Sequence, residues 1–235
     1  MAARPHRGAT PRRPVVAIDG PLASGKSTVA RGVAARLSFG YVDTGAMYRS
    51  VALVAIRRGI DLAHAASVTA VAESLGIEFR GGPNGQRVIL DGEDVTDAIR
   101  TPEVSDGASI VSVVPGVRAA MVATQRALGA RGGVVMEGRD IGTVVFPDAD
   151  VKVFLEASLE SRARRRYEEL RARGIDIDLD EVRRAQAERD RRDSTREHSP
   201  MRPAPDAIVI DTTERTAEDV VGTIIRIVQE RIGVV

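Results

Sequence analysis

Residues 20–27 combine glycines, a lysine and a serine at the spacing of a phosphate-binding loop. Eight consecutive residues fit the pattern G-x-x-x-x-G-K-[ST] at every fixed position: Gly20, Pro21, Leu22, Ala23, Ser24, Gly25, Lys26 and Ser27. Glycines let successive backbone N–H groups turn towards phosphate oxygens, and the positive end of a following helix faces the same anion. In this pattern the lysine contacts the β- and γ-phosphates and the serine hydroxyl binds Mg²⁺. The segment, with Thr28 after it, therefore predicts a site for ATP and magnesium.

A phosphate-binding loop occurs in kinases, motor ATPases and GTPase switches, so it does not by itself name a reaction. A GTPase needs an Asn-Lys-x-Asp segment, and the one asparagine of this chain, Asn84, has no lysine beside it. A GTPase switch is therefore excluded. A motor ATPase stays open, because Glu137 follows the apolar run 133–136 and an acidic residue there can hold magnesium.

Three further segments carry the charges that a phosphoryl-transfer enzyme needs around the moving group. Residues 43–49 and 137–140 each follow a short apolar run, and residues 189–196 are rich in arginine. Ligands of open α/β sheets bind at the carboxyl ends of the strands. We therefore expect these segments to surround the phosphate-binding loop.

The elements that would hold these segments alternate between apolar runs and helical patterns. The runs resemble buried parallel strands and lie at residues 15–18, 41–42, 134–136, 151–155 and 207–210. Helical patterns lie at residues 27–37, 46–58, 117–128, 158–173 and 217–232. Strands alternating with helices predict an α/β fold with helices on both faces of one sheet.

One stretch interrupts this alternation. Residues 76–80 and 87–91 have strand-like patterns on either side of a turn rich in Gly, Pro and Asn at 81–85. This predicts a β-hairpin inside an insert at 61–103, which divides the core into 15–60 and 104–235. Residues 161–202 are dense in arginine and acidic residues, which is typical of a solvated helical hairpin with many ion pairs.

Composition narrows the class of protein. The 235 residues are 43% hydrophobic, enough for one substantial core, and their net charge is +1 from 34 basic and 33 acidic residues. This balance favours neither a nucleic-acid nor a membrane partner. The chain has no cysteine, and its apolar runs are shorter than a membrane span needs. We interpret residues 1–14, which are basic but lack the apolar stretch of a signal peptide, as a disordered tail of a cytoplasmic protein.

The chain resembles the long bacterial type of cytidylate kinase, a family of nucleoside monophosphate kinases. The resemblance runs from about Val15 to the C-terminus and rests on residues 19–27, 43–49, 99–104, 137–147 and 188–196, in that order. It implies a P-loop three-layer core with a five-stranded parallel sheet, a small β-rich insert that binds the monophosphate, and a short lid at about 158–174. It also implies a monomer that uses ATP and Mg²⁺ to convert CMP or dCMP to CDP or dCDP.

The resemblance further implies roles for individual residues. Catalysis would involve Lys26, Arg139 and Arg196, and Arg162 with its neighbours Arg164 to Arg166 would belong to the lid over ATP. Thr44 would contact the acceptor. The acceptor would be bound at its phosphate by Arg49 and Arg139, at its cytosine by Ser109, Arg118 and Asp140, and near its ribose and phosphates by Arg189, Asp193 and Arg196. The chemistry agrees, because a carboxylate accepts from the cytosine amine and an arginine donates to the ring nitrogen and carbonyl.

Plainer explanations remain for several of these residues. Asp140 could pair with Arg139 on the surface, Arg118 could be a solvated helix residue, and Tyr48 could serve packing alone. At the level of function, the alternatives are a kinase for shikimate, gluconate or AMP on the same core, and a regulator that hydrolyses ATP without an acceptor. ADP production measured with each monophosphate would discriminate among them.

Overall fold

A five-stranded parallel sheet forms the centre of the molecule. The computed structural model describes residues 13–82 and 85–233. The sheet contains β1 (Val15–Asp19), β2 (Gly40–Asp43), β6 (Val134–Gly138), β7 (Val151–Glu156) and β8 (Ile208–Asp211), in the order β2-β6-β1-β7-β8. Every neighbouring pair is parallel, so all five carboxyl ends meet at one edge. The five strands predicted from the apolar runs are thus confirmed.

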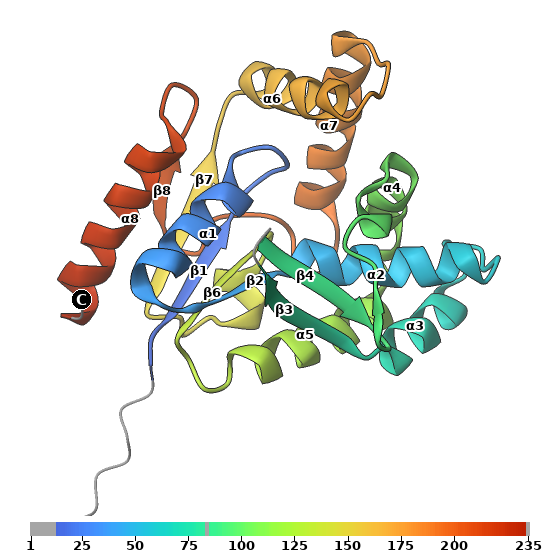
Figure 1. Ribbon diagram of the computed structural model, residues 1–235, viewed down its shortest axis with the longest axis horizontal. Helices are drawn as coiled ribbons and strands as arrows, with labels where there is room; N and C mark the ends of the chain where they lie inside the picture. The colour runs from blue at the N-terminus through green and yellow to red at the C-terminus, as the bar shows by residue number, and fades with distance from the viewer. Residues whose placement is uncertain (1–12, 83–84, 234–235) are drawn as a thin grey trace, which may run out of the picture.

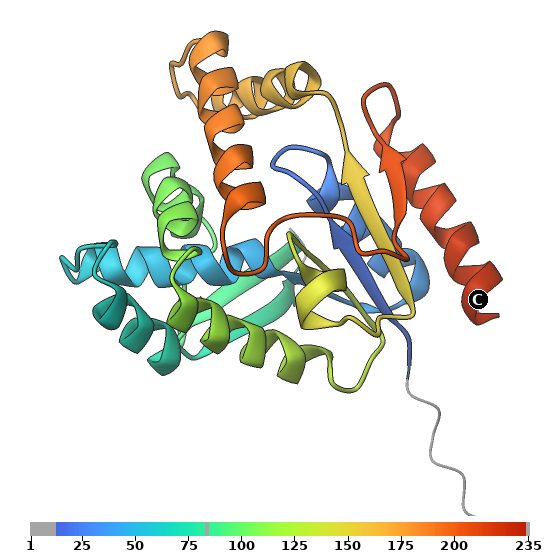
Figure 2. The same ribbon diagram turned by 180° about the vertical axis from the view of Figure 1, so that it is seen from behind.

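Side chains alternate between the two faces of the sheet, and helices cover both faces. Val16 and Ile18 pack with α1 (Lys26–Leu37) and α8 (Ala217–Ile232) on one face. Val15 and Ala17 face the opposite way and pack with η2 (Ile141–Val145), beside α5 (Pro115–Gly129). Figure 1 shows the first face and Figure 2 the second. Because successive side chains of a strand point to opposite faces, both faces of this sheet are apolar and are covered by helices. This arrangement gives the predicted three layers.

A second hydrophobic cluster lies beside the sheet. It is built around α2 (Thr44–Arg57), α3 (Ala65–Ser74), α4 (Pro102–Val111) and α5, together with the antiparallel sheet β3 (Ile77–Gly82), β4 (Gly85–Leu90) and β5 (Glu93–Asp94). A short 3-10 helix, η1 (Ala98–Arg100), leads into α4. The predicted β-hairpin is present, and β5 extends it to three strands. Because the cluster also recruits α2 and α5, the insert boundary at 61–103 stays a prediction.

The arginine-rich segment forms a helical hairpin that projects over the carboxyl ends of the strands (Figure 1). Its helices are α6 (Leu159–Ala172) and α7 (Leu179–Thr195). They share a small apolar core of Ala163, Leu170 and Val182. Exposed ion pairs such as Arg191–Glu188 decorate the outside, as the charge pattern predicted.

The ends of the described chain are anchored to the sheet region. Of the predicted tail at 1–14, residues 1–12 lie outside the described residues. Arg13 lies over the Phe39 ring, 5.1 Å from its centre, and the Pro14 carbonyl accepts from the Gly133 N–H at 2.7 Å.

Within the described residues no single helix is long and apolar enough to cross a membrane; α4 and α5 satisfy length and composition only as a pair bent by 101°.

Candidate active site

The loop from Gly20 to Gly25 has the backbone that phosphate binding requires. A side chain at Gly20 would place its Cβ 2.0 Å from the Leu155 carbonyl oxygen, so only glycine fits there. Gly25, at φ 89°, precedes the first turn of α1 in the left-handed region that favours glycine. The Lys26 ammonium donates to the Pro21 carbonyl at 2.5 Å and is 5% exposed. Burial, with the nearby Arg139 guanidinium, lowers the pKa of Lys26 to about 7.

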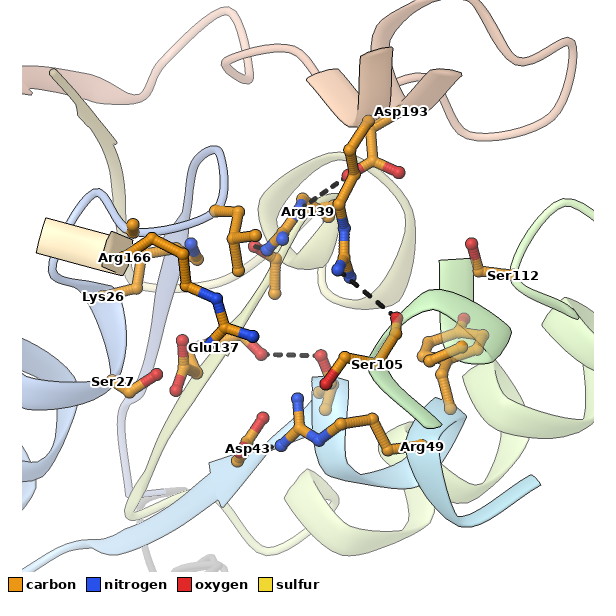
Figure 3. A pocket seen from close by; sticks show the side chains of 18 of the residues that line it. Lys26, Ser27, Asp43, Arg49, Ser105, Ser112, Glu137, Arg139, Arg166 and Asp193 are labelled. Carbon is orange, nitrogen blue, oxygen red and sulfur yellow. Dashed lines mark hydrogen bonds and ion pairs between the residues drawn. The ribbon is translucent and has the colours of Figure 1, made fainter. Parts of the chain in front are cut away.

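A cavity of about 490 Å³ opens beside this loop, at the carboxyl ends of the strands. Its walls come from the loop, from α2 and α4, from the segment after β6, and from both helices of the hairpin (Figure 3). Eleven of its lining residues are lysine or arginine and five are aspartate or glutamate. The excess of positive charge suits a ligand with several phosphates.

One side of the cavity carries arginines anchored by carboxylates. Arg49 binds Asp43 at 2.8 Å, and Arg139 binds Asp193 at 3.0 Å (Figure 3). Asp43 also caps α2 by accepting from the Ala46 N–H at 3.0 Å. Burial raises and Arg49 lowers the pKa of Asp43, and the net shift is downward. These carboxylates orient the guanidinium groups before any ligand arrives.

The opposite, deeper side carries a buried ion pair. Arg118, on α5, donates to the Asp140 carboxylate, and these residues are 4% and 5% exposed. Arg118 also lies 5.8 Å from the centre of the Tyr48 ring, and Arg196 approaches Asp140 at 3.7 Å. Asp140 therefore pairs with Arg118 and not with its neighbour Arg139. Arg118 is buried, so the surface explanations for both residues are excluded.

Several arginines of the cavity keep a donor free. Within the described part of the chain, Arg49 Nε, Arg118 Nε, Arg189 Nε and Arg196 Nη2 are buried and have no hydrogen-bond partner. Burial, together with Arg139, lowers the pKa of Arg189 to about 10. Buried donors normally find acceptors. A ligand rich in acceptor oxygens and nitrogens would satisfy these groups.

Glu137 lies at the end of β6, between the loop and α2. Its carboxylate accepts from the Tyr41 hydroxyl at 2.6 Å, and its carbonyl accepts from the Thr44 hydroxyl at 2.6 Å. Burial and the nearby Asp43 carboxylate raise the pKa of Glu137. Ser27 lines the cavity beside it (Figure 3). No group of three or more His, Cys, Asp or Glu side chains in the described residues forms a metal site of its own.

The hairpin contributes Arg165, Arg166 and Arg173 to the cavity. Of the lid arginines that the resemblance implied, Arg165 and Arg166 therefore line the cavity. Arg162 instead turns away, pairing with Asp190 at 2.7 Å and donating to the Leu22 carbonyl at 3.4 Å. It connects the hairpin to the phosphate-binding loop.

Most of the predicted site residues converge on the cavity: Leu22, Ala23, Gly25, Lys26, Ser27, Thr28, Thr44, Arg49, Arg118, Arg139, Asp140, Arg189, Asp193 and Arg196. Gly20, Pro21 and Ser24 shape the loop behind it. Ser109 does not reach the cavity, and its hydroxyl accepts from Arg192 at 3.2 Å.

Several lining residues received no role from the sequence, among them Arg31, Arg100, Ser105, Ser112, Glu169 and Arg173. Ser112 follows Ser109 by three residues, a spacing that keeps two side chains on neighbouring positions of a helix surface. Arg100 belongs to the segment 99–104, which carried the resemblance but received no role.

A phosphate-binding loop at the carboxyl edge of a five-stranded parallel sheet, facing arginines from separate helices across one cavity, defines a P-loop kinase. A model of the cytidylate kinase family matches residues 16–230. A cytidylate kinase of Geobacillus kaustophilus is 52% identical, over 94% of this chain and 99% of that protein. One of Bacillus velezensis is 50% identical, over 92% and 96%. The chain belongs to the cytidylate kinase family.

Solved structures support the fold alone. An uncharacterized protein from Eubacterium ventriosum superposes with a TM-score of 0.50 at 11% identity, covering 93% of this chain and all of that one.

Proposed function

We propose that the protein transfers the γ-phosphoryl group of ATP to CMP or dCMP, giving ADP and CDP or dCDP. The observation that carries this proposal is the buried Arg118–Asp140 pair, which lines the same cavity as Lys26. Asp140 offers an acceptor for the exocyclic amine of cytosine, and Arg118 offers donors for its ring nitrogen and carbonyl. Uracil presents a carbonyl and an N–H at the first two positions, so it would set acceptor against acceptor and donor against donor.

The other cavity residues receive roles from their positions. The loop from Gly20 to Ser27 and Thr28 binds the phosphates of ATP. Arg49 and Arg139, each already anchored by a carboxylate, bind the phosphate of the acceptor. Arg189 and Asp193 lie one helical turn apart on α7 and face the ribose. Arg196, at 3.7 Å from Asp140, supports the base and neutralises phosphate charge.

Magnesium fits these residues. Mg²⁺ prefers oxygen ligands and takes only one or two from the protein when phosphates supply the others. The Ser27 hydroxyl would hold it, with Glu137 nearby, and when bound it would neutralise charge on the phosphates. The cavity supplies no strong general base near the acceptor phosphate. None is required where transfer is loose and is stabilised by positioned charges.

We also propose a cytoplasmic monomer without a nucleic-acid or membrane partner. The near balance of 34 basic and 33 acidic residues supports the proposed lack of a nucleic-acid or membrane partner. Light scattering at micromolar concentration would test the monomer directly.

The decisive experiment is coupled ADP production with a panel of acceptors. We expect CMP or dCMP to exceed UMP by at least about tenfold in kcat/KM, because buried polar groups would be left unpaired by uracil. Asp140→Ala and Arg118→Met should lower activity with CMP and narrow that preference, while KM for ATP changes little.

Arg183→Met is the matched control for this panel. Arg183 sits on α7 outside the cavity and pairs only with the exposed Asp180, so the acceptor preference should survive its loss. AMP or UMP as the best wild-type acceptor would overturn the cytidylate proposal. An ADP signal independent of any acceptor would favour an ATP-hydrolysing regulator.

A further inference from the structure

Asp19 is a buried carboxylate that the proposed chemistry does not use. It ends β1, directly before Gly20, and it is 5% exposed. It lies behind the phosphate-binding loop and is not among the lining residues of the cavity. No phosphate-binding role in the loop pattern calls for an acidic residue here.

Both oxygens of Asp19 are occupied by one short stretch of backbone. Oδ1 accepts from the Ile141 N–H and Oδ2 accepts from the Gly142 N–H, each at 2.8 Å. These are charge-assisted hydrogen bonds, which are about twice as strong as neutral ones. They join residues more than a hundred positions apart in the chain. The interaction is therefore a fixed tie between β1 and the segment that follows β6.

That segment carries two residues of the proposed acceptor site. Arg139 and Asp140 directly precede Ile141, where the single turn η2 begins. Arg139 points to Asp193 on α7, and Asp140 points to Arg118 on α5. Arg139 and Asp140 lie in a bend between β6 and η2 and reach different helices, so a small rotation of this backbone would misdirect both side chains at once.

The segment is also closely packed at Gly142. A Cβ added there would lie 3.3 Å from the Lys152 stem and 3.5 Å from Asp19 Oδ2. The segment thus packs against both Asp19 on β1 and Lys152 on β7.

Ionisation of the buried Asp19 carboxyl lowers the free energy of unfolding. Burial raises the pKa of Asp19 to about 7, and the two backbone hydrogen bonds offset only part of that effect. Because the folded pKa lies above the ordinary 3.8, the free energy of unfolding decreases as the pH rises from 3.8 through about 7. Stability therefore does not explain a carboxylate at this position.

We propose that Asp19 is a positioning residue for the acceptor site, which fixes Arg139 and Asp140 in register with the phosphate-binding loop through its two hydrogen bonds to Ile141 and Gly142. The proposal rests on the proposed function. Through these two hydrogen bonds, β1, which leads into the phosphate-binding loop, also sets the position of the residues proposed to recognise the base.

The test is Asp19→Asn, which keeps the shape but offers one acceptor and turns an amide N–H₂ towards the second backbone N–H. We expect kcat/KM for CMP to fall at least about tenfold, as loss of one charge-assisted bond implies. The CMP over UMP preference should narrow. The Kd for ATP, measured without acceptor, should change less than about threefold.

Two controls separate positioning from general damage. Asp178→Asn alters another carboxylate that accepts from two backbone N–H groups, those of Asp180 at 2.8 Å and Glu181 at 3.2 Å, and that lies outside the cavity. This variant should leave unchanged the kcat/KM for CMP, the CMP over UMP preference and the Kd for ATP. In a double-mutant cycle, adding Asp19→Asn to Asp140→Ala should narrow the base preference no further. Should Asp19→Asn fail to fold, Gly142→Ala adds a methyl group beside Lys152 and Asp19 Oδ2, crowds the same hydrogen bonds, and should narrow the same preference.

Equal loss of ATP affinity and CMP activity in Asp19→Asn, or a fully retained base preference in either the Asp19 or the Gly142 variant, would overturn the inference. A wild type that does not prefer CMP would instead overturn the proposed function. The two failures are therefore distinguishable in the same assay.

Discussion

Lys26 and Asp19 are buried near each other at the start of the phosphate-binding loop, and burial moves their pKa values to about 7 from opposite directions. For Lys26 the folded value lies below the ordinary 10.5, so its charged form costs stability fully below pH 7, and this cost disappears only above about 10.5. For Asp19 the cost runs the other way and grows as the pH rises from 3.8 through 7. Near neutral pH burial therefore disfavours the charged forms of both groups.

This balance predicts proton uptake when ATP binds. The negative phosphates raise the pKa of Lys26, so binding at pH 7.5 should draw protons from the buffer. Calorimetric titrations in buffers of different ionisation enthalpy measure that uptake. Lys26→Ala should reduce it and lower kcat by at least about a hundredfold, since a charge that faces the developing transition state is removed.

Arg36→Ala is the matched control, because Arg36 lies on the same helix but is exposed and pairs with Glu218. It should keep both the uptake and the turnover. A binding enthalpy independent of the buffer, or equal uptake in Lys26→Ala, would contradict this account of Lys26.

At the scale of the element, the α6–α7 hairpin is the least supported part of the cavity wall. Its own core has three buried side chains, Ala163, Leu170 and Val182, and the other apolar residues that pack on them are only partly buried: Tyr167, Ile175, Ile177 and Leu179. Elements with few buried apolar contacts open at low free energy. Its cavity-facing side presents Arg165 and Arg166, which ATP would attract.

We therefore predict that amide exchange in α6 is fast without ligand and slows when ATP and CMP are both bound, because closure excludes water from the phosphates. Hydrogen–deuterium exchange with mass spectrometry measures this directly. Helix α8, which has a capping box and packs on the sheet, is the internal reference and should not change. Equally slow exchange in α6 in both states would show that the hairpin is rigid.

Some elements of the fold can be recognised in the sequence and others cannot. The five parallel strands are buried on both faces, so each reads as a continuous apolar run. Strand β5 contains only Glu93 and Asp94, and two polar residues have no detectable period. Helix α3 lies inside the predicted insert and α4 begins at its predicted end, and neither helix was predicted from the sequence.

The residues of the candidate site likewise divide into those that the sequence predicts and those that it does not. Fixed spacing made the loop 20–27 recognisable, because each position serves the same phosphate. The pairings of Arg139 with Asp193 and of Asp140 with Arg118 could not be foreseen, since they depend on how α7 and α5 approach one loop. Ser109 was assigned to the base, whereas Ser112, one turn later, reaches the cavity because α4 presents that face.

At the scale of the whole molecule, the cavity is bounded by parts that touch one another directly. Arg173, at the end of α6, donates to the Arg100 carbonyl at 3.1 Å. Arg189, on α7, donates to the Ser105 carbonyl at 3.4 Å. The hairpin that we propose to close over ATP therefore contacts the helical region around the proposed acceptor site.

These contacts predict that ATP and CMP bind with positive coupling, and that Arg173→Ala weakens it. The effect should be modest, below about fivefold in the coupling factor, because the contact is exposed. The Kd for ATP measured with and without CMP gives this factor. Arg171→Ala is the control, since Arg171 lies on the same helix and pairs with the exposed Asp176 outside the cavity. Equal coupling in both variants would rule out a role for Arg173.

The order of strands in the sheet sets a condition on how the chain can fold as it is synthesised. β1 has no neighbour in the first half of the chain: its partners are β6 and β7, and β2 also pairs with β6. The cluster from Ala46 to Met121 is complete in sequence before β6 begins at Val134. On the ribosome, that cluster can pack while β1 is still unpaired, since domains tend to fold as units during synthesis. A nascent chain that ends before Val134 contains the entire phosphate-binding loop but no strand that could hold it in place.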